Sequence, residues 1–454
     1  MARSVDMRIG RPFACLTWFA VPLLLGSTFQ FLYTFVDAAV VGNLIGVDAF
    51  AAVGAAGFLY WLIFSIVLGL TQGFGTVFAQ RYGSGDMEGL RRAYGMAAAL
   101  SLVLGAALTA LGVVFTRPLL ILLNTPASLF DMTAQFLHLM FAGLLITFAY
   151  NLIAAAFRAL GDSRTPLYAL IFSTVLNVAL DILFVKFISA TVSAVAVATL
   201  IAQLFALLYC VWRARPVKDL RVGRADFRID RPTIGRLLHL GLPAGVRNAI
   251  ISLGSLVFQH AINGYGEVFI AGMAAPQKLF GVLNIIGGSM EGAMATFTAQ
   301  NFGARDLPRI KSGVWQALGI QLVSSVALAA LAIAFGRPLM GLLLGSGPNV
   351  SRILDYAQSQ LTVMALFLPA LYLLCMYRAA LGGMGHALLP MIEGFIELFS
   401  CIAVVLVFPR IWAESGLYYA QAIGWVLAAV PLIIAYYIYY RRHVAEQKPA
   451  ARAM

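Results

Sequence analysis

The stretch AQRYGSGD, residues 79–86, recurs as AQNFGARD at residues 299–306. Two further pairs lie at the same offset of 220 residues: FTRPLL (115–120) with FGRPLM (335–340), and RA (158–159) with RA (378–379). Three ungapped matches at one spacing indicate an internal repeat. The chain is therefore expected to fold as two similar halves.

The composition places both halves in a lipid bilayer. Of the 454 residues 61% are hydrophobic and only 11% are charged, whereas soluble domains carry about 25% charged residues. A membrane span requires about 20 mostly apolar residues. Twelve stretches meet this requirement: 13–41, 50–74, 93–115, 133–157, 167–187, 191–212, 238–262, 269–297, 313–335, 357–381, 387–408 and 416–440. They predict an all-α polytopic membrane protein with twelve transmembrane helices in two pseudo-symmetric six-helix bundles.

The basic residues orient these spans, because Lys and Arg gather in cytoplasmic loops. With the N-terminus inside, the inner segments hold most of the 31 Lys and Arg residues, and the largest group lies in residues 213–236. Both termini are therefore predicted to be cytoplasmic, in the cytoplasmic (inner) membrane. The net charge of +12 is explained by this topology and by contact with anionic membrane lipid. No nucleic-acid partner is expected.

The same assignments divide the chain into four parts: an N-lobe (1–212, helices 1–6), a basic cytoplasmic linker (213–236), a C-lobe (237–440, helices 7–12) and a cytoplasmic tail (441–454). Two halves in the same orientation are common in secondary transporters, which handle substrate between them. The first apolar stretch is too long for the apolar region of a signal peptide. The four cysteines show neither metal-ligand spacing nor a disulfide framework.

Polar residues inside the expected spans are the candidates for function. The stretch LNVALDILF (176–184) carries Asn177 and Asp181 four residues apart, on one helical face. Asp37 in the first span and Thr199 in the sixth lie at a similar depth, in the outer half of the membrane. At the repeat-related positions the second half has other residues: Phe258, Glu397, Cys401 and Tyr419. A role in the common scaffold would require these polar groups twice, so we expect them to serve a task of one half.

A carboxylate at membrane depth costs several kcal/mol unless it is neutralised or paired. Two carboxylates with amide and hydroxyl oxygens are hard ligands, so a sodium ion could be held by Asp37, Asn177, Asp181 and Thr199. The same cluster could hold protons, because two neighbouring carboxylates resist double ionisation. The coupling ion is therefore expected to be H+ or Na+, with no other cofactor or metal. Asn and Thr also commonly bond across membrane helices, which leaves a structural role open.

The ordered motifs resemble the multidrug and toxic compound extrusion (MATE) family. The likeness begins with VPLLLGSTFQFLYTFVDAAVVGNLIGVDAFAAVG (21–54) and FRALGDSRTPL (157–167). It continues in the second half through LPAGV (242–246) and YRAALGG (377–383), so it covers essentially the whole chain. The resemblance implies a MATE or MOP-flippase-like fold. It also implies an antiporter that exports organic, often cationic compounds in exchange for protons or sodium ions, by switching between inward-open and outward-open states.

The resemblance further implies site residues. The N-lobe acidic site of the branch that includes archaeal and DNA-damage-inducible transporters is matched by Asp37, Asn151, Asn177, Asp181 and Thr199. Pro22 matches the proline about which the first helix of that branch bends, although membrane helices also tolerate proline without such a role. The acidic residues of the other bacterial branch appear here as Ile251 and Leu371. A second-lobe sodium site of that kind is therefore not expected.

The second half has ionisable residues of its own. Glu397 is the deepest, and it is a candidate for sensing cations in a central cavity, with Lys278 as a neutralising partner. Arg247, Glu291 and Glu393 are expected to pair or to reach the interface. The residues that could line the substrate cavity are Gln30, Tyr33, Gln72, Gln259, Lys278, Asn284 and Glu397. Helical phase alone does not distinguish a cavity face from packing between helices.

Three classes of function remain open. The first is a secondary active multidrug efflux antiporter, acting as a monomer on small, amphipathic, often cationic compounds. The second is a flippase or exporter of a lipid-linked or other endogenous substrate, for which a strongly basic cavity would be expected. The third, a membrane enzyme, ranks last, because the five histidines are scattered and no paired acidic metal motif accompanies them.

Overall fold

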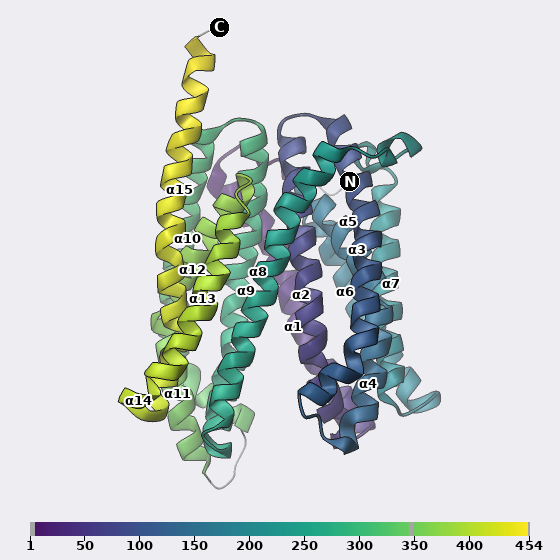
Figure 1. Ribbon diagram of the computed structural model, residues 1–454, viewed down its shortest axis with the longest axis vertical. Coiled ribbons are helices and arrows are strands. Elements are labelled where there is room, and N and C mark those ends of the chain that lie inside the picture. Colours follow the sequence, from purple (N-terminus) through teal and green to yellow (C-terminus); the bar gives the residue numbers. More distant parts are fainter. Residues whose placement is uncertain (1–4, 345–348, 453–454) are drawn as a thin grey trace. The chain divides into compact units, whose positions relative to one another are not determined.

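The chain, seen in a computed structural model, folds into helices throughout residues 5–344 and 349–452, which are the residues that the structure describes (Figure 1). The main helices are α1 (Pro12–Leu44), α2 (Val47–Gly83), α3 (Met87–Leu122), α4 (Ala127–Ala142), α5 (Leu144–Ala159), α6 (Arg164–Phe187), α7 (Val192–Ala214), α8 (Arg231–Asn263), α9 (Glu267–Gly303), α10 (Leu307–Leu344), α11 (Val350–Leu366), α12 (Leu368–Gly383), α13 (Leu388–Val407) and α15 (Ala420–Arg452). Short elements complete the set: η1 (Lys218–Leu220), η2 (Arg224–Phe227), α14 (Pro409–Trp412) and η3 (Ala413–Tyr419).

The helices agree with the expected membrane architecture. Among the described residues, nine helical segments are long and apolar enough to span a membrane, or eleven if each of two bent pairs is one span. The last segment, Leu388–Gln447, is 60 residues long and contains both α13 and α15, separated by α14 and η3. When α13 and α15 are counted separately, the structure supplies the twelve spans expected from the sequence.

The internal repeat is visible in the helix boundaries. Helices α2 and α9 are both 37 residues long, and they begin at Val47 and Glu267, which are 220 residues apart. Helices α1 and α8 are both 33 residues long, and each contains one proline in its interior, Pro22 and Pro243. The repeated sequence therefore encodes a repeated helical plan.

The AQRYGSGD and AQNFGARD stretches each form a helix end, a turn and a helix start. The Oδ1 atom of Asp86 accepts a hydrogen bond from the Gly89 N–H at 2.8 Å, and that of Asp306 accepts one from the Arg309 N–H at 3.0 Å. These bonds satisfy backbone donors that the first turn of α3 and of α10 would otherwise leave free. The Gly89 N–H and Arg81 hold the pKa of Asp86 below its usual range.

Two spans are bent by 45°, one between α4 and α5 and the other between α11 and α12. The first bend lies at Gly143, where the side chain of Leu200 occupies the space that a Cβ atom would need. The second lies at Phe367, two residues before Pro369, whose missing N–H interrupts the backbone hydrogen bonds. Different residues thus produce the same bend at related places in the two halves.

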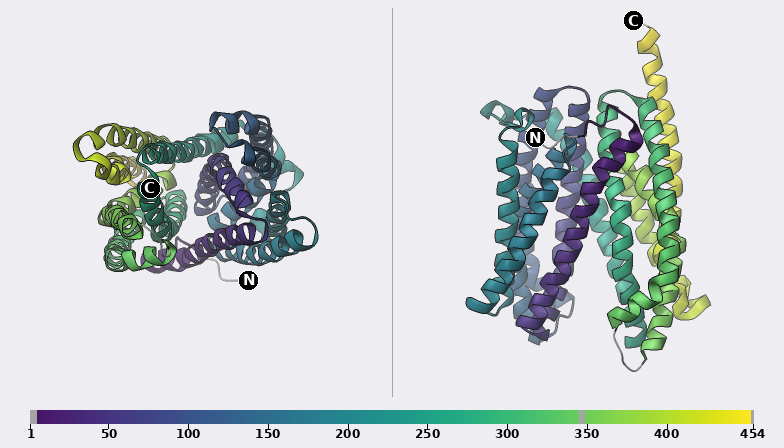
Figure 2. Two further views of the ribbon diagram at one scale, coloured as in Figure 1. Left: turned by 90° about the horizontal axis from the view of Figure 1, so that it is seen from below. Right: turned by 180° about the vertical axis from the view of Figure 1, so that it is seen from behind.

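The chain divides into two compact units. The first consists of Val21–Gly245 with the start of the chain up to Asp6, and the second consists of Val246–Met454 with Met7–Ala20. In the first unit α6 packs along α7, and α2 packs against α4 and α5. In the second unit α9 packs against α11 and α12, and α13 packs along α15. Each unit is a helical bundle in the end-on view of Figure 2.

The start of α1 belongs to the second unit. The backbone N–H of Phe13 donates a hydrogen bond to Gln316 Oε1 at 2.7 Å. The guanidinium group of Arg309 binds the carbonyl oxygens of Met7 and Gly10, at 3.1 and 2.7 Å. These bonds tie the residues around the start of α1 to α10.

The start of α8 belongs correspondingly to the first unit, where it packs on α2. Gly69 and Gly73 of α2 lie so close to Ala244 and Gly241 of α8 that a Cβ atom on either glycine would overlap the α8 backbone. The boundary between the units falls inside α1, beside Pro22, and inside α8, beside Pro243.

Exposed apolar side chains mark the faces that a bilayer would cover. Helix α3 exposes Leu102 and Val103 by 63% and 65%, and α10 exposes Val323 by 72%. In water such surfaces would drive aggregation, whereas lipid chains solvate them at no cost. The fold is therefore that of an integral multi-pass membrane protein.

The contact between α2 and α8 gives a first testable prediction. Gly73→Ala should lower the free energy of unfolding by about 1–3 kcal/mol, because the added methyl group forces two helix backbones apart. Thermal unfolding of the purified protein in detergent, followed by size-exclusion chromatography, measures this loss.

Gly57→Ala is the matched control on the same helix, because no atom lies within 4 Å of its Cβ position. This variant should be as stable as the parent, or slightly more stable, since alanine favours helix formation. Equal stability of Gly73→Ala and Gly57→Ala would contradict the close packing of α2 on α8.

Candidate cation-coupling site

Two aspartates face each other in the interior of the first unit. Asp37 comes from α1 and Asp181 from α6, and their carboxyl groups are adjacent. Asp181 is 0% exposed. Neither its two carboxyl oxygens nor Oδ1 of Asp37 finds a hydrogen-bond donor in the protein. The part of the chain that the structure describes offers the pair no Lys, Arg or His ion-pair partner.

The neighbouring polar side chains come from the same three helices that the sequence singled out. Asn177 lies one turn before Asp181 on α6, and its Nδ2 atom donates to Oγ1 of Thr199 on α7 at 3.4 Å. The hydroxyl group of Tyr33, one turn before Asp37 on α1, is 3.4 Å from the same Oγ1 atom. The long contact between α6 and α7 thus holds Asn177, Asp181 and Thr199 together.

This cluster has more hydrogen-bond acceptors than donors. Oδ1 of Asn177 is buried without a partner, as are three of the four carboxyl oxygens of Asp37 and Asp181. Buried acceptors without donors are rare in proteins and costly. A bound proton supplies a donor, and a sodium ion supplies a charge that such oxygens ligate. The residues therefore fit either coupling ion.

Two further observations concern the groups available to bind an ion at the site. No group of three or more His, Cys, Asp or Glu side chains that could hold a metal ion occurs within residues 5–344 and 349–452. Asn151 donates its side-chain N–H to the carbonyl oxygen of Thr147, on its own helix α5, at 2.9 Å. The structure therefore joins Asp37, Asn177, Asp181 and Thr199 by contacts, but records no bond from Asn151 to them.

A second polar group next to the site was missed in the sequence. Oγ1 of Thr147 on α5 donates to Oε1 of Gln203 on α7 at 2.5 Å, and the buried hydroxyl group of Tyr60 lies beside both side chains. Gln203 follows Thr199 by four residues, so it lies on the same face of α7. That spacing is the sequence signal that could have identified it.

Pro22 lies where α1 passes from one unit to the other. Because proline has no N–H, the carbonyl oxygen of Trp18 loses its usual helical partner, which weakens the helix at this point. The structure thus places the residue expected to bend α1 at the boundary between the units.

Five of the seven residues proposed to line a cavity are exposed polar residues within apolar helices, whereas Tyr33 and Glu397 are half-buried. Gln30, Gln72, Gln259, Lys278 and Asn284 are all exposed on their own unit. Tyr33 is instead engaged with Thr199, and Gln259 bonds Asn263 on its own helix at 2.9 Å. Polar side chains at membrane depth avoid lipid. The faces of α1, α2, α8 and α9 that carry these side chains are therefore not expected to face lipid.

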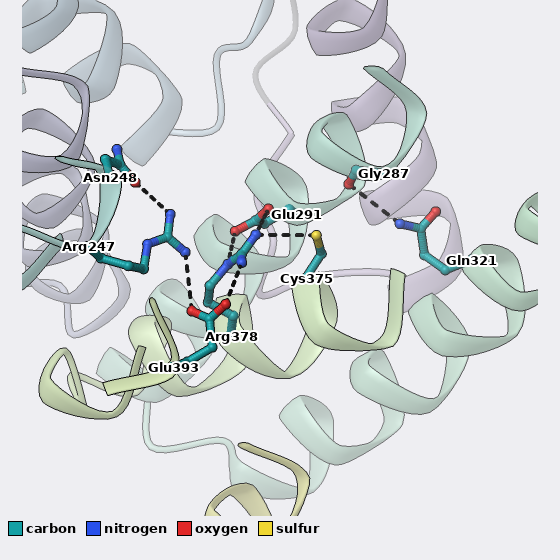
Figure 3. Close-up of polar contacts among 8 residues, drawn as sticks. All are labelled: Arg247, Asn248, Gly287, Glu291, Gln321, Cys375, Arg378 and Glu393. Carbon is teal, nitrogen blue, oxygen red and sulfur yellow. Dashed lines mark hydrogen bonds and ion pairs between the residues drawn. The ribbon is translucent and has the colours of Figure 1, made fainter. Parts of the chain in front are cut away.

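The second unit contains a buried network of charges, drawn in Figure 3. Arg378 of α12 binds both carboxyl oxygens of Glu291 of α9, each at 2.8 Å, and Oε1 of Glu393 of α13 at 3.2 Å. Arg247 of α8 lies 3.9 Å from Oε2 of Glu393 and donates to Oδ1 of Asn248 at 2.8 Å. The expectation that Arg247, Glu291 and Glu393 would pair is confirmed.

Glu397 lies at the edge of this network. Its carboxyl group is beside that of Glu393, and the nearby positive charges are Arg378 and Arg247. Lys278 was expected to be its partner, but it is exposed and forms no ion pair within the described part of the chain. Lys278 lies on α9 13 residues before Glu291, which corresponds to about 20 Å along the helix from that glutamate.

Comparisons with known proteins agree with this fold. The family model described as MatE matches residues 22–183 and 243–411. The chain is 29% identical to the probable multidrug resistance protein YpnP of Bacillus subtilis over 309 residues, which is 68% of this chain and 69% of the relative. It is 25% identical to the FAD transporter of Shewanella oneidensis over 434 residues, or 93% of each chain.

Among solved structures, a MATE in complex with MaL6 matches with a TM-score of 0.91 at 21% sequence identity, over 98% of this chain and 100% of that chain. The matching family is one of membrane transporters, so the class of this protein is an integral membrane transporter rather than an enzyme. The chain belongs to the MATE family of membrane transporters, since the family model covers most of its length.

The acceptor excess of the acidic site gives a second prediction. Asp181→Asn should raise the free energy of unfolding by about 1–3 kcal/mol at neutral pH in sodium-free buffer, because the amide adds donors to a cluster that lacks them. For the parent protein, acid or sodium should stabilise in the same way, since a bound cation favours the folded state. Thermal unfolding in detergent, at several pH values and with sodium or choline chloride, tests both effects.

Asp131→Asn serves as the control, because Asp131 is exposed and pairs with Arg117 at the surface. It should change stability by less than about 0.5 kcal/mol and leave the responses to acid and sodium intact. A large loss of stability in Asp181→Asn would instead mean that the Asp181 carboxylate has a partner in the folded protein.

Proposed function

We propose that the protein is a secondary active multidrug efflux antiporter, which exports organic, often cationic compounds in exchange for H+ or Na+ by alternating access. The observation that carries this proposal is the pair of the half-buried Asp37 and the fully buried Asp181, which lacks a positive partner among the described residues. A structural pair would be expected to have one. The multidrug resistance proteins among the relatives support the class of substrate.

The proposed coupling operates through α1. Discharge of Asp37 and Asp181 by a proton or a sodium ion changes how α1 packs on α6 and bends the helix near Pro22. Asn177 and Thr199 position the carboxyl pair, and Asn151 acts from the neighbouring helix. Drug and cation then favour different arrangements of α1. Each therefore lowers the affinity of the protein for the other by the same factor.

The polar side chains within the apolar helices are proposed to line the path of the drug. Gln30, Tyr33 and Gln72 would line it from the N-lobe, with Gln259, Lys278, Asn284 and Glu397 from the C-lobe. Such a mixed surface of amides, rings and one acid accepts amphipathic cations without a strict shape requirement. We propose a monomer in the cytoplasmic membrane, with both termini cytoplasmic and lobes 1–212 and 237–440 joined by the basic linker 213–236.

A second candidate is the export of an endogenous substrate, such as a lipid-linked compound or a nucleotide cofactor. The observation that favours it is the likeness to the FAD transporter of Shewanella oneidensis, which extends over 93% of each chain. An anionic substrate of this kind would use Lys278 rather than Glu397.

Transport by purified protein in liposomes tests the proposed function. Efflux of a fluorescent organic cation should be driven by a proton gradient or by a sodium gradient, and the effective gradient identifies the coupling ion. Asp37→Asn and Asp181→Asn should each reduce gradient-driven efflux by about 100-fold or more, because the amide can bind neither ion as a charge pair.

Asp131→Asn should transport at the rate of the parent, because its carboxylate lies at the surface. Absence of transport under both gradients, by folded protein that instead moves FAD, would replace the multidrug proposal with the second candidate. Undiminished coupling in both the Asp37 and Asp181 variants would disprove the proposed ion site.

A further inference from the structure

The charge network of the second unit is not balanced. It contains two arginines, Arg247 and Arg378, and three glutamates, Glu291, Glu393 and Glu397. The two arginine side chains are 10% and 11% exposed, and that of Glu393 is 1% exposed. If all five groups were ionised, the network would carry one surplus negative charge in an apolar interior. A charge of this kind is costly unless a proton or cation neutralises it.

The pairing within the network shows where the surplus lies. Glu291 is satisfied, because Arg378 binds both of its carboxyl oxygens at 2.8 Å. Glu393 is only partly satisfied: Oε1 binds Arg378 at 3.2 Å, but Oε2 accepts no hydrogen bond and lies 3.9 Å from Arg247. The carboxyl group of Glu397 is adjacent to this glutamate. The surplus charge therefore belongs to the pair Glu393 and Glu397.

The surroundings of the pair provide no further positive charge. The titratable groups facing it are Arg247 from α8, Glu291 from α9, and Arg378 with the thiol of Cys375 from α12. On α13 itself the thiol of Cys401 follows Glu397 by one turn. On α15 the residue next to Glu397 is Gly424, which has no side chain. Within the described residues, only Arg247 and Arg378 can offset the three carboxylates.

The internal repeat shows that the scaffold does not require the three glutamates, although Arg158 stands in the first unit where Arg378 stands in the second. The repeat offset of 220 carries Glu291, Glu393 and Glu397 onto Thr71, Ser173 and Asn177. The hydroxyl of Thr71 donates to the carbonyl oxygen of Val67 at 2.9 Å, and that of Ser173 to the carbonyl oxygen of Ala202 at 2.8 Å. Neutral side chains thus fill the same places in the first unit, so the glutamates of the second unit are free to serve another purpose.

We propose that Glu393 and Glu397 of the second unit share one exchangeable proton, which makes the arginine–glutamate network a second protonation site of the transporter, separate from the Asp37–Asp181 pair. Glu397 is the proton-binding residue, because Glu393 is held by Arg378. The proton is taken up when the network would otherwise carry its surplus charge, and it is released to water when the pair is solvated. No bond other than the O–H bond forms or breaks.

The proposal deepens the proposed function, on which it rests for its role in transport. It adds a titrating group to a cycle that would otherwise depend on the first unit alone. With both sites active, the number of protons that bind would be larger than the first site can hold. The protonation itself, however, is a property of the folded protein and can be measured without any drug.

The first test is infrared difference spectroscopy of the purified protein during a pH titration, which detects the C=O stretch of protonated carboxyl groups. The double variant Asp37→Asn, Asp181→Asn should retain a titrating carboxyl band. Adding Glu397→Gln to that background should abolish this band, because glutamine does not titrate and the remaining two arginines and two glutamates balance. Persistence of the band in the triple variant would overturn the proposal.

Charge variants at the neighbours test the cause. Glu291→Gln removes one negative charge, so the band should vanish at a pH lower than in the parent by about one to three units. Arg247→Gln removes one positive charge and should move the loss of the band by a similar amount in the opposite direction. No movement, or movement in the same direction for both variants, would show that charge balance does not control the proton.

Transport then tests the role of the site. In proteoliposomes, Glu397→Gln should reduce the protons moved per drug molecule, measured with a pH-sensitive dye, whereas Asp37→Asn should lose gradient-driven efflux altogether. An unchanged proton count in Glu397→Gln would refute a role in coupling. If the parent showed no cation-driven transport, the proposed function would fail while the infrared result would still decide whether the second site exists.

Discussion

The free-energy cost of an ionised group in an apolar interior determines how the buried charges of this protein are arranged. Such a group must be matched by an opposite charge, a proton or a bound cation. The acidic site of the first unit contains the half-buried Asp37 and the fully buried Asp181, and no basic side chain among the described residues pairs with either of them. The charge network of the second unit contains three glutamates, and Arg247 and Arg378 pair with two of them. Under the proposed function, the carboxyl groups without a basic partner are therefore the groups that bind ions from solution.

The two halves share one helical plan but differ in how their buried charged groups are compensated. Helices α2 and α9 have the same length and the same spacing in sequence, yet α9 carries Glu291 where α2 has Thr71. Similarly, Glu397 of α13 stands where α6 has Asn177. The scaffold tolerates either choice because helices satisfy their own backbone bonds in lipid. The repeated helical plan therefore does not itself require the glutamates of the second unit.

Much of the architecture could be predicted from the sequence, for identifiable reasons. The apolar spans and the repeat at residues 79–86 and 299–306 are properties of continuous segments, so they can be recognised in the sequence alone. The meeting of Asn177, Asp181 and Thr199 followed from spacing on two adjacent helices. Arg247, Glu291 and Glu393 were expected to pair or to reach the interface, but Arg378 of α12, which binds both glutamates, could not be deduced, because the rotation of each helix about its axis depends on packing. The same uncertainty led to Lys278 as a partner of Glu397.

Helix α1 explains how charge at one site can act on the rest of the chain. Its end carries Asp37 within the first unit, whereas its start is bound to α10 of the second unit through Gln316. A straight helix would transmit any displacement along its length, but Pro22 removes a backbone hydrogen bond at the boundary. Under the proposed function α1 adopts two shapes, and an ion changes their balance only to the extent that it binds one more tightly than the other. The carboxyl group of Asp37 would provide that difference in affinity, because its neutralisation alters the free energy of burial by several kcal/mol.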